Sequence, residues 1–181
     1  MASEEIVVND NETLRNVFVF IADGVAHKYP SPAEPVVLNQ EGCRYTPRVF
    51  GIQTGQPLQI LNSDNTMHNV HAASQQNPPF NLGMTRHTKQ LTRTFSRREI
   101  MIPIRCNVHP WMAAYAGVFE HPFYAVTGEN GSYRLGPLPP GEYMVTAWHE
   151  KLGRSEQRVT LGDSVKQTVD FAFKQNDSLP E

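Results

Sequence analysis

Short segments in which apolar and polar residues alternate recur along most of this chain, and turn-forming residues separate them. The 181 residues include 14 prolines and 12 glycines, which are spread in small clusters. Many short strands with turns between them are typical of β-sandwiches and barrels, and no long amphipathic helical pattern competes. We therefore predict an all-β fold. The strands expected before residue 122 are 17–21, 35–38, 48–52, 58–61, 68–73, 91–95, 100–106 and 115–119.

Charge and hydropathy exclude two kinds of interaction. The formal net charge is -2, so no basic surface points to nucleic acid. No run of about 20 apolar residues occurs, so the sequence predicts no transmembrane span.

The segment CNVHPWM, Cys106 to Met112, places three potential metal donors at regular intervals. Cys106 offers a thiolate, His109 an imidazole and Met112 a thioether, and a second imidazole, His68, stands upstream in NTMHNVHAAS. One Cys with two His and a weak axial Met favours a mononuclear copper site that transfers electrons. Structural zinc sites usually take four Cys or His ligands and have no use for a Met. The donor set therefore indicates copper.

The phase of the flanking strands indicates where these donors lie. Residues 100–106 alternate, so that Ile100, Ile102, Ile104 and Cys106 are expected on the core-facing side of a strand. The other two donors of this segment would then follow in a loop. His71 is an odd number of residues from His68 and so on the opposite face. We therefore predict His68 as the ligand and His71 as a packed residue or a neighbour of the ligands.

Two motifs together resemble a known family. His68–His71 reads His-Asn-Val-His, and Cys106–Met112 reads Cys-x-x-His-Pro-aromatic-Met. In this order and spacing they resemble the motifs of the cupredoxins, or blue copper proteins, in the amicyanin and plastocyanin branch. The resemblance covers residues 48–122.

The resemblance implies a Greek-key β-sandwich that holds one copper ion, either Cu(I) or Cu(II). Asn69 is expected next to the ligands, tying its strand to the cysteine loop, and hydrogen bonds to the thiolate would tune the reduction potential. His109, flanked by Pro110 and Trp111, is implied as the surface through which electrons pass. The implied copper ligands are His68, Cys106, His109 and Met112.

Cys43, in QEGCRYTP, is the second of only two cysteines. An even count in an exported protein first suggests a disulfide, which would consume the Cys106 thiolate and abolish the copper site. Alternatively, Cys43 is a free buried thiol, or it lies near enough to the metal to modify the site. We rank the free or structural thiol first and the disulfide second. We do not expect a two-copper centre, which needs two bridging cysteines on one loop.

The sequence pattern changes after His121. GENGSYRLGPLPPGEYMVTAWHE contains two turn signals followed by an alternating run, and residues Val165 to Phe173 alternate again. Residues 123–174 resemble the carboxypeptidase regulatory-like domain, which implies a smaller prealbumin-like β-sandwich. The predicted domains are a copper domain at 1–122, this second domain at 123–175 and a flexible tail at 176–181.

The functional hypothesis is a type 1 copper protein that acts as a single-electron carrier. We do not expect an enzyme, because the sequence has no His-x-His pair for a catalytic copper. The expected partners are redox proteins, either a cytochrome or another copper protein. The alternatives are a copper-binding subunit or domain of a larger redox enzyme, or a copper-free secreted binding module if Cys43 and Cys106 pair.

An extracytoplasmic location, such as the periplasm, follows from the copper interpretation, since blue copper proteins are normally exported. The first residues, MASEEIVVND, lack the positive and apolar regions of a signal peptide. We therefore expect that a signal or anchor has been removed ahead of this sequence.

Overall fold

The computed structural model describes residues 5–163 and 166–174, and it confirms the all-β prediction: within these residues there are strands and turns but no helix. The part of the chain that is described thus contains no helix long and apolar enough to cross a membrane. The chain divides into two compact units. We call residues 28–122 the sandwich unit, and the described residues before and after it the terminal unit.

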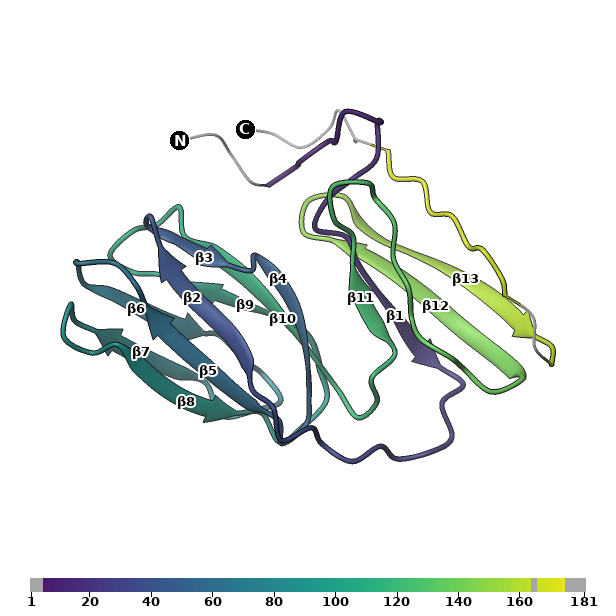
Figure 1. Ribbon diagram of the computed structural model, residues 1–181, viewed down its shortest axis with the longest axis horizontal. Helices are drawn as coiled ribbons and strands as arrows, with labels where there is room; N and C mark the ends of the chain where they lie inside the picture. Colours follow the sequence, from purple (N-terminus) through teal and green to yellow (C-terminus); the bar gives the residue numbers. More distant parts are fainter. Residues whose placement is uncertain (1–4, 164–165, 175–181) are drawn as a thin grey trace. The chain divides into compact units, whose positions relative to one another are not determined.

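The sandwich unit consists of two sheets that face each other (Figure 1). One sheet has the order β4-β10-β9-β6-β7 and the other the order β3-β2-β5-β8. The strands pair antiparallel except for β2 with β5 and β4 with β10, which are parallel. The bounds are β2 Val36–Glu41, β3 Arg44–Thr46, β4 Val49–Gln53, β5 Pro57–Asn62, β6 His68–Ala72, β7 Phe80–Met84, β8 Gln90–Thr94, β9 Glu99–Arg105 and β10 Ala113–Phe119.

The core of this unit lies between the two sheets and includes two of the predicted metal donors. Leu38 and Ile60 from one sheet and Ile104 from the other are completely buried. Each such side chain stabilises the fold by about 1.5–3 kcal/mol. Cys106 and Met112 belong to the same buried cluster. The cysteine loop is therefore anchored in the core at both of its ends.

The predicted phase of strand β9 is wrong at its first isoleucine. Ile100 is 44% exposed, whereas Met101 is only 7% exposed. Ala116 of β10 pairs with Ile102, but Val118 pairs with Glu99, so β9 carries one extra residue at this point. The extra residue is a β-bulge, which turns the side chains before it to the other face. The alternation is as predicted only from Ile102 onward.

The terminal unit contains one four-stranded sheet of order β11-β1-β12-β13. Its strands are β1 Phe18–Asp23, β11 Tyr124–Val126, β12 Gly141–His149 and β13 Gly153–Leu161. The prediction that residues 1–27 belong to the copper domain is therefore corrected, because β1 pairs with β11 on one side and β12 on the other. Residues 18–21 are buried without alternation, and such a strand needs neighbours on both edges and cover on both faces.

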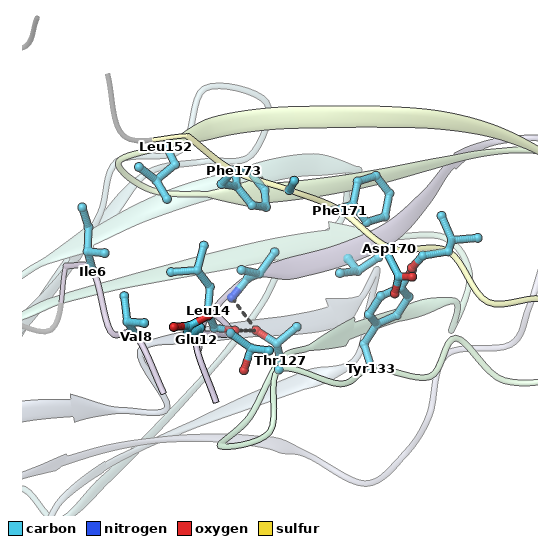
Figure 2. Close-up of a pocket in the computed structure, with 16 residues that line it drawn as sticks. Ile6, Val8, Glu12, Leu14, Thr127, Tyr133, Leu152, Asp170, Phe171 and Phe173 are labelled. Atoms are coloured by element: carbon cyan, nitrogen blue, oxygen red, sulfur yellow. Dashed lines mark hydrogen bonds between the residues drawn. The ribbon is translucent and has the colours of Figure 1, made fainter. Parts of the chain in front are cut away.

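A C-terminal segment, residues 166–174, forms no strand but contacts this sheet: the side chain of Gln157 donates to the carbonyl of Asp170 at 2.6 Å, and the rings of Phe173 and His149 lie 6.2 Å apart. Val169, Phe171 and Phe173 are half-buried and alternate with exposed residues, as predicted. They line a cavity of about 520 Å³ together with Leu14 and Tyr133 (Figure 2). The second sheet of a prealbumin-like sandwich is not seen in the described residues. Val165 and the predicted tail, 176–181, lie outside them.

In the sandwich unit, the carboxylate of Glu99 organises the turn between β6 and β7. It accepts hydrogen bonds from the backbone amides of Gln75 at 2.6 Å, Gln76 at 3.1 Å and Asn77 at 3.2 Å, and from the hydroxyl of Ser74. Partial burial alone would raise the pKa of Glu99, but these donors outweigh it and lower the pKa from 4.5 to about 2. The ionised form is therefore favoured in the folded state.

We expect Glu99→Gln to reduce the free energy of unfolding by about 1–3 kcal/mol at neutral pH, since amide donors would lose a charged acceptor. Because the folded pKa is depressed, the contribution of Glu99 is fully present above its ordinary pKa of 4.5 and is lost as the pH falls toward about 2. Urea unfolding at several pH values should show the two proteins converging in acid. Glu120→Gln, at an exposed position, should match wild type throughout, and a constant gap for Glu99→Gln would contradict the assignment.

Candidate metal centre

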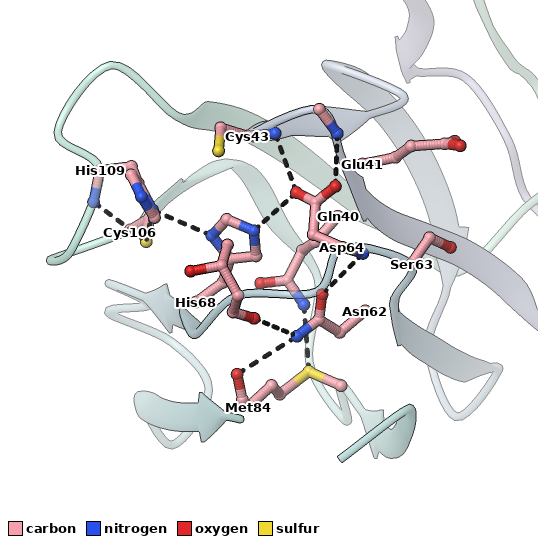
Figure 3. Close-up of polar contacts among 12 residues, drawn as sticks. Gln40, Glu41, Cys43, Asn62, Ser63, Asp64, His68, Met84, Cys106 and His109 are labelled. Atoms are coloured by element: carbon pink, nitrogen blue, oxygen red, sulfur yellow. Dashed lines mark hydrogen bonds and ion pairs between the residues drawn. The ribbon is translucent and has the colours of Figure 1, made fainter. Parts of the chain in front are cut away.

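Four segments of the sandwich unit bring possible metal donors and their supports together (Figure 3). The turn between β2 and β3 contributes Cys43, the loop before β6 contributes Asp64, and the first residue of β6 is His68. The loop between β9 and β10 contributes Cys106 and His109. Because loops join strands at the ends of a sandwich, residues far apart in sequence meet here.

The two imidazoles face each other through the same ring nitrogen. Nδ1 of His68 lies 3.0 Å from Nδ1 of His109, and the ring centroids are 4.7 Å apart. His68 is completely buried and His109 is half-buried. Two nitrogens at this distance share one proton between them, and a metal ion bound to both would replace that proton.

Two thiols, Cys43 and Cys106, lie near the imidazole pair. The ligand atoms of Cys43, His68 and His109 all lie within 4.8 Å of one another. The Sγ atom of Cys106 is 4.0 Å from Nδ1 of His109, and Cys106 is 3% exposed. Both cysteines are free thiols, so the structure agrees with the first-ranked alternative for Cys43 and not with the disulfide. The predicted donors His68, Cys106 and His109 are brought together, and Cys43 joins them.

The loop that holds Cys106 is closed by its own backbone. The amide of His109 donates to Sγ of Cys106 at 3.4 Å, and the amide of Met112 donates to the carbonyl of His109 at 2.9 Å. The amide of Cys106 donates to the carbonyl of Met112 at 3.3 Å. The Met112 side chain is 1% exposed and packs in the core cluster. Axial ligation by Met112 stays a prediction.

Asn69 lies where it was expected, between the His68 strand and the cysteine loop. Its Oδ1 accepts from the amide of Asn107 at 2.7 Å and from the thiol of Cys106 at 3.4 Å. Its carbonyl accepts the hydroxyl of Tyr45. Burial, and then the nearby Cys106 thiol, raise the pKa of Tyr45, so this hydroxyl stays a donor. His71 is half-buried on the opposite face of β6, opposite Arg105 of β9.

Asp64 is the residue that the sequence interpretation missed. Its Oδ2 lies 2.7 Å from Nε2 of His68, and its two oxygens accept the amides of Gly42 at 2.8 Å and Cys43 at 2.9 Å. Partial burial would raise the pKa of Asp64, but the bonds from Cys43, His68 and Gly42 outweigh this and lower it. An ionised Asp64 places the His68 proton on Nε2 and leaves Nδ1 free as a donor atom for a metal. The signal in the sequence that could have identified Asp64 is an acidic residue four positions before His68.

The turn that presents Asp64 is itself held by a buried amide side chain. Asn62 is 1% exposed. Its Oδ1 accepts the amide of Asp64 at 3.1 Å, and its Nδ2 donates to the carbonyl of Thr66 at 3.1 Å (Figure 3). Since both ends of the turn are bonded to one buried side chain, the position of the carboxylate is defined before any metal binds.

Comparison with known proteins gives structural similarities only. No family model matches the chain, and no curated protein sequence matches it either. The copper-containing nitrite reductase of Thermus scotoductus SA-01 is 24% identical, with a TM-score of 0.44, over 55% of this chain and 25% of its own length. The chain thus spans about a quarter of that protein.

Two solved amicyanin mutants are also similar. A Cu(I) form is 17% identical with a TM-score of 0.42 and covers 46% of this chain and 81% of its own. An oxidised form is 17% identical with a TM-score of 0.42 and covers 64% of this chain and 99% of its own. At these scores the assignment of the site depends on its own side chains.

We expect Asp64→Asn to weaken metal binding about 10- to 100-fold, the usual effect of losing a partner that orients a histidine ligand. Asn has one acceptor oxygen, so it cannot satisfy both the turn amides and His68. Affinity can be measured by competition with a copper chelator of known strength. The control is Asp163→Asn, at an exposed turn position, and equal affinities for the two variants would contradict the role of Asp64.

Proposed function

We propose that this protein is a cupredoxin-like copper protein that carries single electrons and is not itself an enzyme. The observation that carries the proposal is the convergence of two imidazole Nδ1 atoms, 3.0 Å apart, with the buried thiol of Cys106, 4.0 Å from one of them. Two His and one Cys are the strong ligands that blue copper sites use. The residues proposed to hold the copper are His68, Cys106, His109 and Met112, whose thioether would be the weakest donor.

The surroundings of these residues suit reversible electron transfer. When bound, the copper would accept and release one electron by cycling between Cu(II) and Cu(I). The chain would keep the donor atoms in place during this change, because Asp64 orients His68, Asn69 ties the cysteine loop to β6, and backbone bonds close that loop. A site held by its own hydrogen bonds needs little rearrangement on electron transfer. This supports copper over a purely structural metal.

Exposed apolar side chains beside the ligands support the proposal that a redox partner docks at this surface. Met67 is 49% exposed, Val108 47% and Trp111 56%. The Trp111 ring lies 5.2 Å from the half-buried ring of His109. Exposed apolar side chains around a metal ligand are typical of surfaces that bind partners. We propose that electrons pass through His109 to a cytochrome or another copper protein, outside the cytoplasm.

One equivalent of Cu(II) added to the purified protein should produce an intense visible absorption from thiolate-to-copper charge transfer. Cys43→Ser, which leaves Cys106 as the one cysteine of the chain, should keep an absorption of this kind, and adding Cys106→Ser should remove it, because a hydroxyl cannot replace the thiolate. An electron paramagnetic resonance spectrum recorded on the same sample reports the ligand geometry. A colourless wild-type protein, or a colourless Cys43→Ser variant in which Cys106 is the one remaining thiol, would rule out the proposed site.

Met112→Leu should still bind copper but should have a higher reduction potential. The apolar side chain in place of the thioether disfavours the more highly charged Cu(II) state. A spectroelectrochemical titration measures the shift. Met144→Leu, on β12 of the terminal unit, is the control and should leave the potential unchanged. If the two variants had equal potentials, Met112 would be a packing residue only.

A further inference from the structure

We infer that Cys43 is a second thiolate ligand of the metal, bound together with His68, Cys106 and His109. The inference rests on the proposed function and adds a donor to it. The ligand atoms of Cys43, His68 and His109 lie within 4.8 Å of one another, although they come from three separate segments. Figure 3 shows these side chains together with Cys106. A metal ion that binds both imidazoles is therefore within reach of two thiols.

The backbone amide of Cys43 and the ring of His68 are bound by the same carboxylate. The Oδ2 atom of Asp64 binds both the amide of Cys43, at 2.9 Å, and Nε2 of His68, at 2.7 Å. Its Oδ1 binds the amide of the preceding residue, Gly42, at 2.8 Å. One carboxylate thus sets the position of the turn relative to the imidazole. Any displacement of Cys43 from the site would break a charge-assisted hydrogen bond.

The carbonyl of Cys43 is tied to the other ligand segment. Nε1 of Trp111 donates to this carbonyl at 3.1 Å, and Trp111 stands two residues after His109. Cys43 also has a φ of 54°, and Gly42 before it has a φ of 60°. A left-handed conformation is uncommon for a residue with a side chain and is kept only when the surroundings impose it. Here the hairpin turn imposes it, because Glu41 pairs with Arg44 and a two-residue turn of this kind requires a positive φ at both central positions.

The chemistry of the four donors is consistent with one metal ion. Thiolates are soft ligands that suit copper, above all Cu(I), and imidazoles suit both of its charge states. Ordinary packing against the core accounts for the half-burial of Cys43, but it does not require the thiol to face two imidazole nitrogens. Two imidazoles and two thiolates, together with the proposed thioether of Met112, leave no open position for a substrate, as expected for an electron carrier and unlike a catalytic metal site.

The experiment that tests this inference measures the number of sulfur ligands of copper in the full chain. One equivalent of Cu(I) is added without oxygen to wild type, Cys43→Ser, Cys43→Gly and Cys106→Ser. X-ray absorption at the copper edge then gives the number of thiolate neighbours, and the rate of iodoacetamide alkylation shows which thiols the metal protects. Cys43→Gly guards against misfolding of the Ser variant, since glycine adopts a positive φ without strain.

We expect two thiolate neighbours in wild type and one in each cysteine variant, with the half-buried Cys43 thiol protected from alkylation when copper is bound. A single thiolate in wild type, with Cys43 alkylated equally fast in the presence and absence of copper, would overturn the inference and leave the proposed function standing. Failure of the proposed function would differ, because X-ray absorption would then show no thiolate neighbour of copper in wild type.

Discussion

The carboxylate of Asp64 is the interaction on which the whole site depends. It binds the ring of His68 and the amides of the turn that carries Cys43, so it connects two segments that no strand pairing joins. Its charge is maintained because those three donors lower its pKa. In the half-buried position of Asp64 these bonds are stronger than they would be in water. The donor atoms are therefore arranged by the protein in the absence of a metal.

This arrangement is supported by the packing between the two sheets. The core cluster includes Cys106 and Met112, the two ends of the ligand loop, together with the strands on either side. Because a packed core resists small displacements, the loop cannot move independently of β9 and β10. Ligands fixed by both packing and hydrogen bonds change little when an electron arrives, so the rigidity of the fold and the proposed electron transfer have the same origin.

Most of the strands were predictable, because alternation and turn residues are local signals. The exceptions show what local signals omit. Strand β3 has three residues and β7 lies in the long connection between residues 74 and 90, and both depend on pairing with neighbours. The bulge at Met101 reversed the face of Ile100, since one extra residue is invisible in an alternating pattern. The membership of β1 in the terminal unit also depends on pairing between residues distant in the chain.

The sequence by itself determined the β class and the chemical identity of the donors, since both follow from residue types at fixed spacing within short segments. The grouping of His68 with Cys106 and His109 was also foreseeable, because the two motifs mark strand ends. Only the tertiary structure decided that Cys43 lies with them and that Asp64 holds it there. The turns that carry these two residues meet only after the two sheets pack, and the spacing along the chain says nothing of which turns share one end of a sandwich.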